Sequence, residues 1–136
     1  MPRAHAYEVI MRALTIKQPW AQLIALGVKR IENRTWLPPN WVMGERIAIH
    51  AGQAWVPGVH MAPDRADCVH GAIIATATVS RIVASKQAAE RTRKGQGRWF
   101  VGPFGWVLED VNQVEPITRT GQLGLWKVGD HERYGL

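Results

Sequence analysis

Three charged residues, Lys29, Glu32 and Arg34, occur close together in the segment QPWAQLIALGVKRIENRTW, residues 18–36. Glu32 and Arg34 are two positions apart, so on a strand they share one face at a separation of about 7 Å. Flanking cations keep such a carboxylate ionised. Lysine and arginine would donate to a phosphate or a carbonyl oxygen, and the glutamate would accept from an amino group such as that of cytosine. The alternative is a solvated set of ion pairs that contributes little energy.

The elements on either side of these charges would hold them in place. A short helix is expected to begin near Pro19, to bury an apolar face that includes Trp20, Leu23 and Ile24, and to end at Gly27. The alternation over residues 30–36 predicts a strand. Lys29 would then lie at the turn between helix and strand.

Further strands are predicted along the rest of the chain. Leu14 and Ile16 point inward in the first of them, with Thr15 and Lys17 outward. The strands are expected at residues 11–17, 45–50, 71–83, 104–108, 111–117 and 124–128. Many short strands with few helices favour a mixed α+β fold, mainly β: a small barrel of about five to six strands with two or three flanking helices.

Length and charge restrict the class of protein. The chain has 136 residues, which predicts one domain over residues 11–128, with a loosely ordered extension at 1–10 and a tail at 129–136. A net charge of +6 favours an anionic partner, most commonly nucleic acid. No apolar run is long enough to span a bilayer, so no membrane partner is expected. The single Cys68 is typical of a reducing, cytoplasmic location.

A second basic region covers residues 84–98. Its first half is expected to be a helix and its second half a mobile loop, followed by Trp99 and Phe100. Irregularly spaced cations neutralise phosphates, and a nearby aromatic ring can stack on a base. The cations expected to contact a nucleic-acid backbone are Lys86, Arg91, Arg93, Lys94 and Arg98. The alternative is that this region is a solvated, partly disordered loop that binds no nucleic acid.

Three residues are additional ligand-binding candidates: Trp20, Arg46 and His50. Trp20 follows Pro19 beside the charged segment, although the helix face favours a core role. A strand histidine can carry protons but is more often structural. His60, Asp64, Cys68 and His70 match no compact zinc-ligand spacing, so no metal and no cofactor are expected.

The ordered motifs of the chain resemble those of ASCH domains, relatives of the PUA fold. The hallmark G-x-K-x-x-E-x-R corresponds to Gly27, Lys29, Glu32 and Arg34. Similar pieces follow in order at residues 47–52, 71–80, 104–111 and 121–128. The resemblance implies a PUA-like barrel with a cleft lined by Lys29, Glu32 and Arg34. It also implies that RNA or a modified nucleoside is bound there, with DNA as a further partner.

The reaction, if any, stays open because members of this family differ. Some resemble amidohydrolases that remove the acetyl group of 4-acetylcytidine, and others are ribonucleases or DNA binders. The deacetylase-like members carry a threonine three residues after the lysine, where this chain has Glu32, and an acid in the strand that corresponds to residues 71–80, where it has none. An amidohydrolase or ribonuclease would therefore use Lys29 and Glu32. The other alternative is a protein-interaction module built on spare tryptophans such as Trp41, Trp55 or Trp99.

Overall fold

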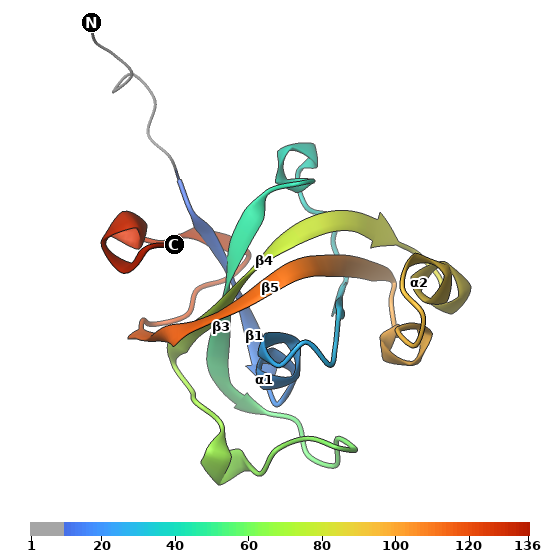
Figure 1. Ribbon diagram of the computed structural model, residues 1–136, viewed down its shortest axis with the longest axis horizontal. Helices are drawn as coiled ribbons and strands as arrows, with labels where there is room; N and C mark the ends of the chain where they lie inside the picture. The colour runs from blue at the N-terminus through green and yellow to red at the C-terminus, as the bar shows by residue number, and fades with distance from the viewer. Residues whose placement is uncertain (1–9) are drawn as a thin grey trace, which may run out of the picture.

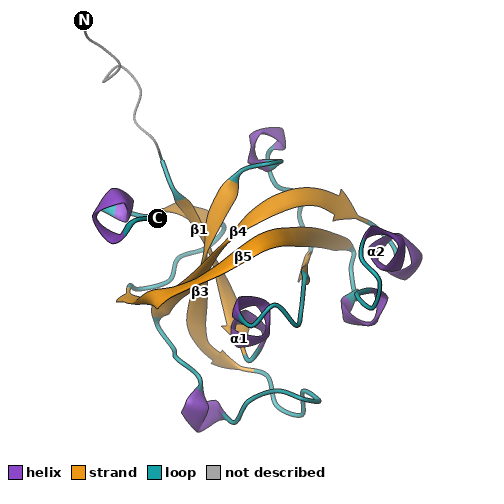
Figure 2. Ribbon diagram, in the orientation of Figure 1, coloured by secondary structure: helices purple, strands orange, loops and turns teal. Residues whose placement is uncertain are grey.

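The computed structural model describes residues 10–136, and the expected extension at residues 1–10 lies almost wholly outside them. Six strands form the framework of the structure (Figures 1 and 2). They are β1 (Arg12–Gln18), β2 (Ile31–Arg34), β3 (Arg46–Trp55), β4 (Ala72–Val83), β5 (Phe104–Thr118) and β6 (Leu125–Lys127).

Two α-helices and four single-turn 3₁₀ segments connect the strands. The helices are α1 (Trp20–Ala25) and α2 (Lys86–Thr92), and the 3₁₀ segments are η2 (Asn40–Val42), η3 (Arg65–Asp67), η4 (Gly97–Trp99) and η5 (His131–Tyr134). α1 lies against the concave side of the strands, and α2 stands at the ends of β4 and β5 (Figure 1). No helix among residues 10–136 is long and apolar enough to cross a membrane.

The strands form one mixed sheet in the order β2-β5-β4-β3-β1-β6. Only the β1–β3 pair is parallel among the described ladders. The sheet curls so strongly that Arg34 on β2 donates a hydrogen bond to the Thr15 carbonyl on β1, which is fifth in the order. The prediction of a mixed, mainly β fold is confirmed: about five to six strands and two or three helices were expected, and the sheet has six strands with two α-helices.

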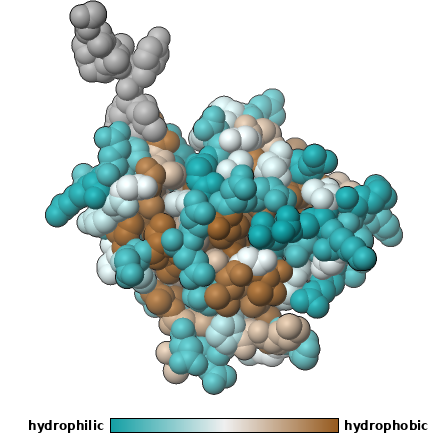
Figure 3. Space-filling model, viewed as in Figure 1, coloured by the Kyte–Doolittle hydropathy of each residue, from teal (hydrophilic) through white to brown (hydrophobic). Residues whose placement is uncertain are grey.

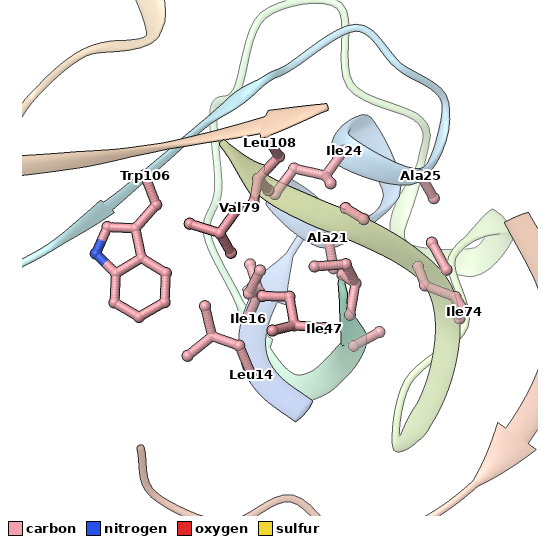
Figure 4. Packing of buried hydrophobic residues seen from close by; sticks show 14 of the residues in the cluster. Leu14, Ile16, Ala21, Ile24, Ala25, Ile47, Ile74, Val79, Trp106 and Leu108 are labelled. Atoms are coloured by element: carbon pink, nitrogen blue, oxygen red, sulfur yellow. The ribbon is translucent and has the colours of Figure 1, made fainter. Parts of the chain in front are cut away.

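The main core fills the concave side of the curled sheet. Leu14 and Ile16 of β1 meet Ile24 of α1 and Trp106 of β5 there (Figure 4). Leu14 and Ile16 are buried as predicted, while Thr15 is partly exposed and Lys17 is exposed. Apolar burial of this kind contributes about 25 cal/mol for each Å² removed from water. This packing fixes β1 and α1, the two elements that precede Lys29, Glu32 and Arg34 in the chain.

β5 differs from the prediction because it is continuous. Two strands were expected, at residues 104–108 and 111–117, yet a single strand runs from Phe104 to Thr118. Asp110 lies between the two expected strands, and its φ of +50° is in the left-handed region. Shifts of the β4–β5 register occur around this residue, so the ladder accommodates it as β-bulges.

The basic region at residues 84–98 is more ordered than the sequence suggested. Its first half forms α2, capped by the Ser85 hydroxyl, which accepts from the Ala88 N–H at 3.0 Å. The second half was expected to be a mobile loop but forms a turn and η4. Glu90 holds it, because its carboxylate accepts from the N–H groups of Gly95 and Gly97 at 2.8 and 2.9 Å.

Candidate functional site

Lys29, Glu32 and Arg34 form one ion-paired cluster. Lys29 Nζ lies 3.4 Å from Glu32 Oε1, and Arg34 Nη2 lies 2.9 Å from Glu32 Oε2. Lys29 and Glu32 are only 2% and 6% exposed, whereas the Arg34 side chain remains partly exposed. The cluster is therefore not the solvated set of ion pairs that was the alternative interpretation, because the carboxylate is held between two cations and is mostly buried.

The end of α1 determines where Lys29 lies. The buried Gln18 side chain accepts from the Gln22 N–H at 2.8 Å and fixes the first turn of the helix. Gly27 then adopts φ +78°, which turns the chain out of the helix at low steric cost. The Leu23 carbonyl accepts from the Lys29 N–H at 3.1 Å, so the lysine begins directly beneath the helix end.

Burial lowers the pKa of the Lys29 ammonium from its ordinary value, and the positive charge of Arg34 adds to this effect. The charge and hydrogen bond of Glu32 act in the opposite direction but do not cancel it. The ammonium also donates to the Ile31 carbonyl and lies 5.4 Å from the centre of the Trp20 ring. A buried lysine whose pKa is lowered gives up its proton more readily than an exposed one, which is the property that a lysine base needs.

Arg34 divides its donors between the cluster and the fold. Nε donates to Glu32 Oε2 at 3.0 Å, and Nη2 donates to the Thr15 carbonyl at 2.8 Å. The Nη1 group has no hydrogen-bond partner among residues 10–136. Part of the guanidinium thus holds β2 against β1, and part of it is left for a ligand.

The cluster forms part of a cleft of about 590 Å³. Three indole rings, those of Trp20, Trp36 and Trp99, contribute to its lining. Trp20 and Trp99 meet edge to face, with ring centres 6.0 Å apart. Trp20 therefore belongs to the cleft, whereas Leu23 and Ile24 of the same helix are buried. The cleft combines aromatic surface with charge, as ligand sites in proteins commonly do.

The charges that line the cleft are mostly positive. Its lining includes four cations and one acid: Lys17, Lys29, Arg34 and Arg98 against Glu32. Glu32 is already paired with two of the cations. Lys17 and Arg98 are exposed and have no acidic partner within residues 10–136. Arg98 lies 4.8 Å from the centre of the Trp99 ring, which places a cation beside an aromatic face.

Two amide side chains that the sequence did not single out hold the cleft wall. Asn33 Oδ1 accepts from the N–H groups of Val101 and Gly102 at 2.8 and 2.9 Å, and its Nδ2 donates to the Trp99 carbonyl at 2.9 Å. Gln96 accepts from the Arg30 N–H at 2.7 Å. The sequence did carry one sign of a role for Asn33, because this polar residue shares a predicted strand face with the apolar Ile31. Gln96 gave no such signal, because its partner lies 66 residues away.

Arg46 and His50 lie outside the cleft. Arg46 donates to the hydroxyls of Thr76 and Thr78 on β4, at 2.6 and 3.0 Å, so these contacts tie it to the sheet. His50 faces a neighbouring hollow, where its Nε2 lies 2.7 Å from the Arg119 carbonyl. The structure therefore brings Trp20 to the charged cluster but not these two residues.

Only one of the predicted backbone-contacting cations lines the cleft, and it is Arg98. Arg93 is paired with Glu109 at 3.3 Å. The other three, Lys86, Arg91 and Lys94, are exposed on α2 and the turn after it. Hydrophilic residues cover the side of the molecule where α2 lies (Figure 3).

Metal ligation has no geometric support in the described part of the chain. No group of three or more His, Cys, Asp or Glu side chains gathers among residues 10–136. Burial and the neighbouring acids raise the pKa of the Cys68 thiol, which disfavours the thiolate that a metal would need.

Residues 14–118, which contain the cluster and every lining residue of the cleft, match the model of the ASCH domain family. The chain belongs to the ASCH family. The matched residues include Gly27 and the ion-paired cluster of Lys29, Glu32 and Arg34.

Known relatives of this ASCH domain include much longer proteins. Activating signal cointegrator 1 from Homo sapiens is 34% identical over 108 residues, and the Mus musculus protein is 25% identical over 108 residues. The match covers 78% of this chain but only 14% of each relative. The similarity is therefore to one region of those proteins.

Solved structures support the same fold. The ASCH protein of Zymomonas mobilis superimposes with a TM-score of 0.56 at 17% identity, over 90% of both chains. A single-residue mutant of that protein gives a TM-score of 0.57 at 18% identity, over 90% of this chain and 91% of that one. At this identity the likeness shows the fold alone.

Proposed function

We propose that this ASCH domain binds RNA or a nucleotide-like ligand in the cleft at Lys29, Glu32 and Arg34. The observation that carries the proposal is the uncompensated charge of the cleft. Its one acid is internally paired, so Lys17 and Arg98 on its rim remain available to a polyanion. Positive clefts attract phosphates, and their contacts make the affinity strongly dependent on salt.

The aromatic lining favours unpaired bases as the bound groups. Trp20, Trp36 and Trp99 offer ring surface inside the cleft, and only an unstacked base can reach such a site. The free Nη1 donors of Arg34 would contact a phosphate or a base carbonyl. The exposed cations of α2, Lys86, Arg91 and Lys94, would add backbone contacts beyond Arg98.

The test is a binding titration followed by the intrinsic tryptophan fluorescence, with a short single-stranded RNA and with cytidine monophosphate. Lys29→Met removes the charge and keeps a similar unbranched shape, and Arg98→Ala removes a rim cation. Arg65→Ala is the matched control, since this exposed arginine does not line the cleft. Both cleft variants are expected to bind more weakly, with circular dichroism unchanged. Unaltered affinity in both would refute the proposal.

A hydrolytic role is the second candidate, favoured by the lowered pKa of Lys29. The neutral Lys29 amine would take a proton from a water molecule as that water attacks the amide carbonyl of an acetylated cytidine. The lysine ammonium would return this proton to N4 as the C–N bond breaks, which releases acetic acid and cytidine, and Glu32 would accept a hydrogen bond from the ammonium. Mass spectrometry of N4-acetylcytidine and short RNAs incubated with the protein tests it. Acetate or cleaved RNA that forms with the wild-type protein but not with Lys29→Met supports an enzyme. If both substrates stay intact, the protein binds without turnover.

A docking role for proteins has less support. Of Trp41, Trp55 and Trp99, only Trp41 is mainly exposed, at 55%. Trp99 packs against Trp20 in the cleft wall. The spare tryptophans therefore do not form one shared apolar patch.

A further inference from the structure

A second hollow lies beside the cleft, across β1. It has a volume of about 780 Å³ and is lined by His50, Gln53 and the loop at residues 118–123. A smaller hollow of about 260 Å³ borders both. It shares Lys17 and Arg34 with the cleft, and Gln53 and Leu123 with the second hollow. Because they share these lining residues, the three hollows form one groove over the outer side of β1.

The extension of the groove carries positive charge and no acid. Arg119 lines the second hollow, and Lys17 lines the connecting one. Neither hollow has an aspartate or glutamate among its lining residues. These cations favour a ligand that carries negative charge where it continues from the cleft into this region.

Exposed apolar side chains stand at both ends of the groove. Val101 borders the cleft and is 83% exposed, and Leu123 borders the other two hollows and is 98% exposed. They are the most exposed large apolar side chains of the described residues. These side chains offer apolar contact surface to a ligand that lies in the groove. Bases joined by phosphates would match both the apolar contacts and the positive charge.

Internal contacts hold the second hollow in shape. The Arg119 carbonyl can only accept, so His50 carries its proton on Nε2, and its Nδ1 accepts from the Thr15 hydroxyl at 3.2 Å. The Thr15 oxygen in turn accepts from Trp126 Nε1 at 3.0 Å. A Cβ added to Gly121 would lie 2.9 Å from that oxygen, so the loop already packs closely on β1.

We infer that the groove binds a single-stranded polynucleotide over several nucleotides. One base would occupy the cleft, the chain would cross Lys17, and a following nucleotide would lie in the second hollow against Arg119 and Leu123. This inference rests on the proposed function of the cleft. It adds a path across β1 toward the loop at residues 118–123, which is separate from the α2 cations.

The experiment compares cytidine monophosphate with single-stranded cytidylates of increasing length, as RNA and as DNA. Wild-type affinity is expected to rise from the monomer to the longer strands. Arg119→Ala and Leu123→Asp are expected to weaken binding of the longer strands several-fold and to leave the monomer unaffected. Arg65→Ala serves as the control. Loss of the Arg119 contact is also expected to make the slope of log K against log salt concentration less steep by about 0.7.

The possible failures are separable. If the longer strands bind no better than the monomer, or bind both loop variants as tightly as wild type, the extension is wrong while the cleft proposal stands. If neither monomer nor strand binds the wild-type protein, the proposed function fails and this inference fails with it. The RNA and DNA series identify which polynucleotide the groove prefers.

Discussion

Arg34 Nη2 lies 2.8 Å from the carbonyl oxygen of Thr15, although their strands are first and fifth in the order of the sheet. This hydrogen bond joins β2 to β1 across the curl. The same guanidinium is paired with Glu32. One side chain thus belongs to both the fold and the candidate ligand site, so a substitution at Arg34 can change both stability and binding.

Arg34→Ala is expected to destabilise the protein as well as weaken ligand binding. Hydrogen bonds to charged groups contribute about 1.5–3 kcal/mol, and this variant loses one to a backbone carbonyl and others to a carboxylate. Arg34→Lys would keep the charge but not both contacts, because a lysine lacks the planar fork. Urea unfolding of both variants measures the cost. If Arg34→Ala unfolds with the same free energy as the wild type, the contact to Thr15 does not stabilise the curled sheet.

Glu32→Ala is expected to be more damaging than Lys29→Met. Removing the glutamate leaves the buried ammonium of Lys29 without its counter-ion, and breaking a buried pair in this way costs about 3–5 kcal/mol. In Lys29→Met the carboxylate still has Arg34. Thermal unfolding of the two variants side by side checks the order, and a reversed order would contradict the ion-paired description of the cluster.

Asn33→Ala is expected to loosen the cleft wall. The substitution leaves the N–H groups of Val101 and Gly102 without their acceptor. Hydrogen exchange at residues 99–102 should become faster, and affinity for the cleft ligand should fall. Asn112→Ala is a suitable control, because Asn112 is exposed on β5. Equal exchange rates in the two variants would argue against a supporting role for Asn33.

Stability is expected to fall as the solution becomes acidic, in part through His50. Burial lowers the pKa of its imidazole more than the hydrogen bond to the Arg119 carbonyl raises it. The unfolded chain, with a histidine pKa of about 6.5, therefore binds the proton more readily than the folded protein. This contribution is complete above that pH and is lost progressively below it. In His50→Gln the free energy of unfolding should change less between pH 7 and pH 5, and an identical slope would exclude His50 as a cause.

Much of the fold and part of the site followed from local sequence patterns. The alternation around Leu14 and Ile16, the glycine after α1 and the run of β-branched residues in β4 each specify their own element. Glu32 and Arg34 are two positions apart, so strand geometry was enough to place them on one face, and the family resemblance placed Lys29 beside them.

The parts that local patterns missed depend on contacts between distant segments. Asn33 and Gln96 act through partners 66 or more residues away, and spacing within one element cannot reveal them. His50 was placed correctly on a strand, but the curl of the sheet turned it toward the second hollow instead of the cleft. The second half of the basic region was expected to be a mobile loop, and no local pattern indicated that Glu90 would hold two backbone N–H groups there.

The pairing of Glu32 inside the cleft separates two kinetic roles. Glu32 offsets one of the two internal cations, so the larger part of the field that steers an anion comes from the rim, at Lys17 and Arg98. Rim charges govern the association rate, whereas buried hydrogen-bonded charges govern dissociation. The speed of capture and the residence time of a ligand would therefore be set by different residues, and each can be adjusted without the other.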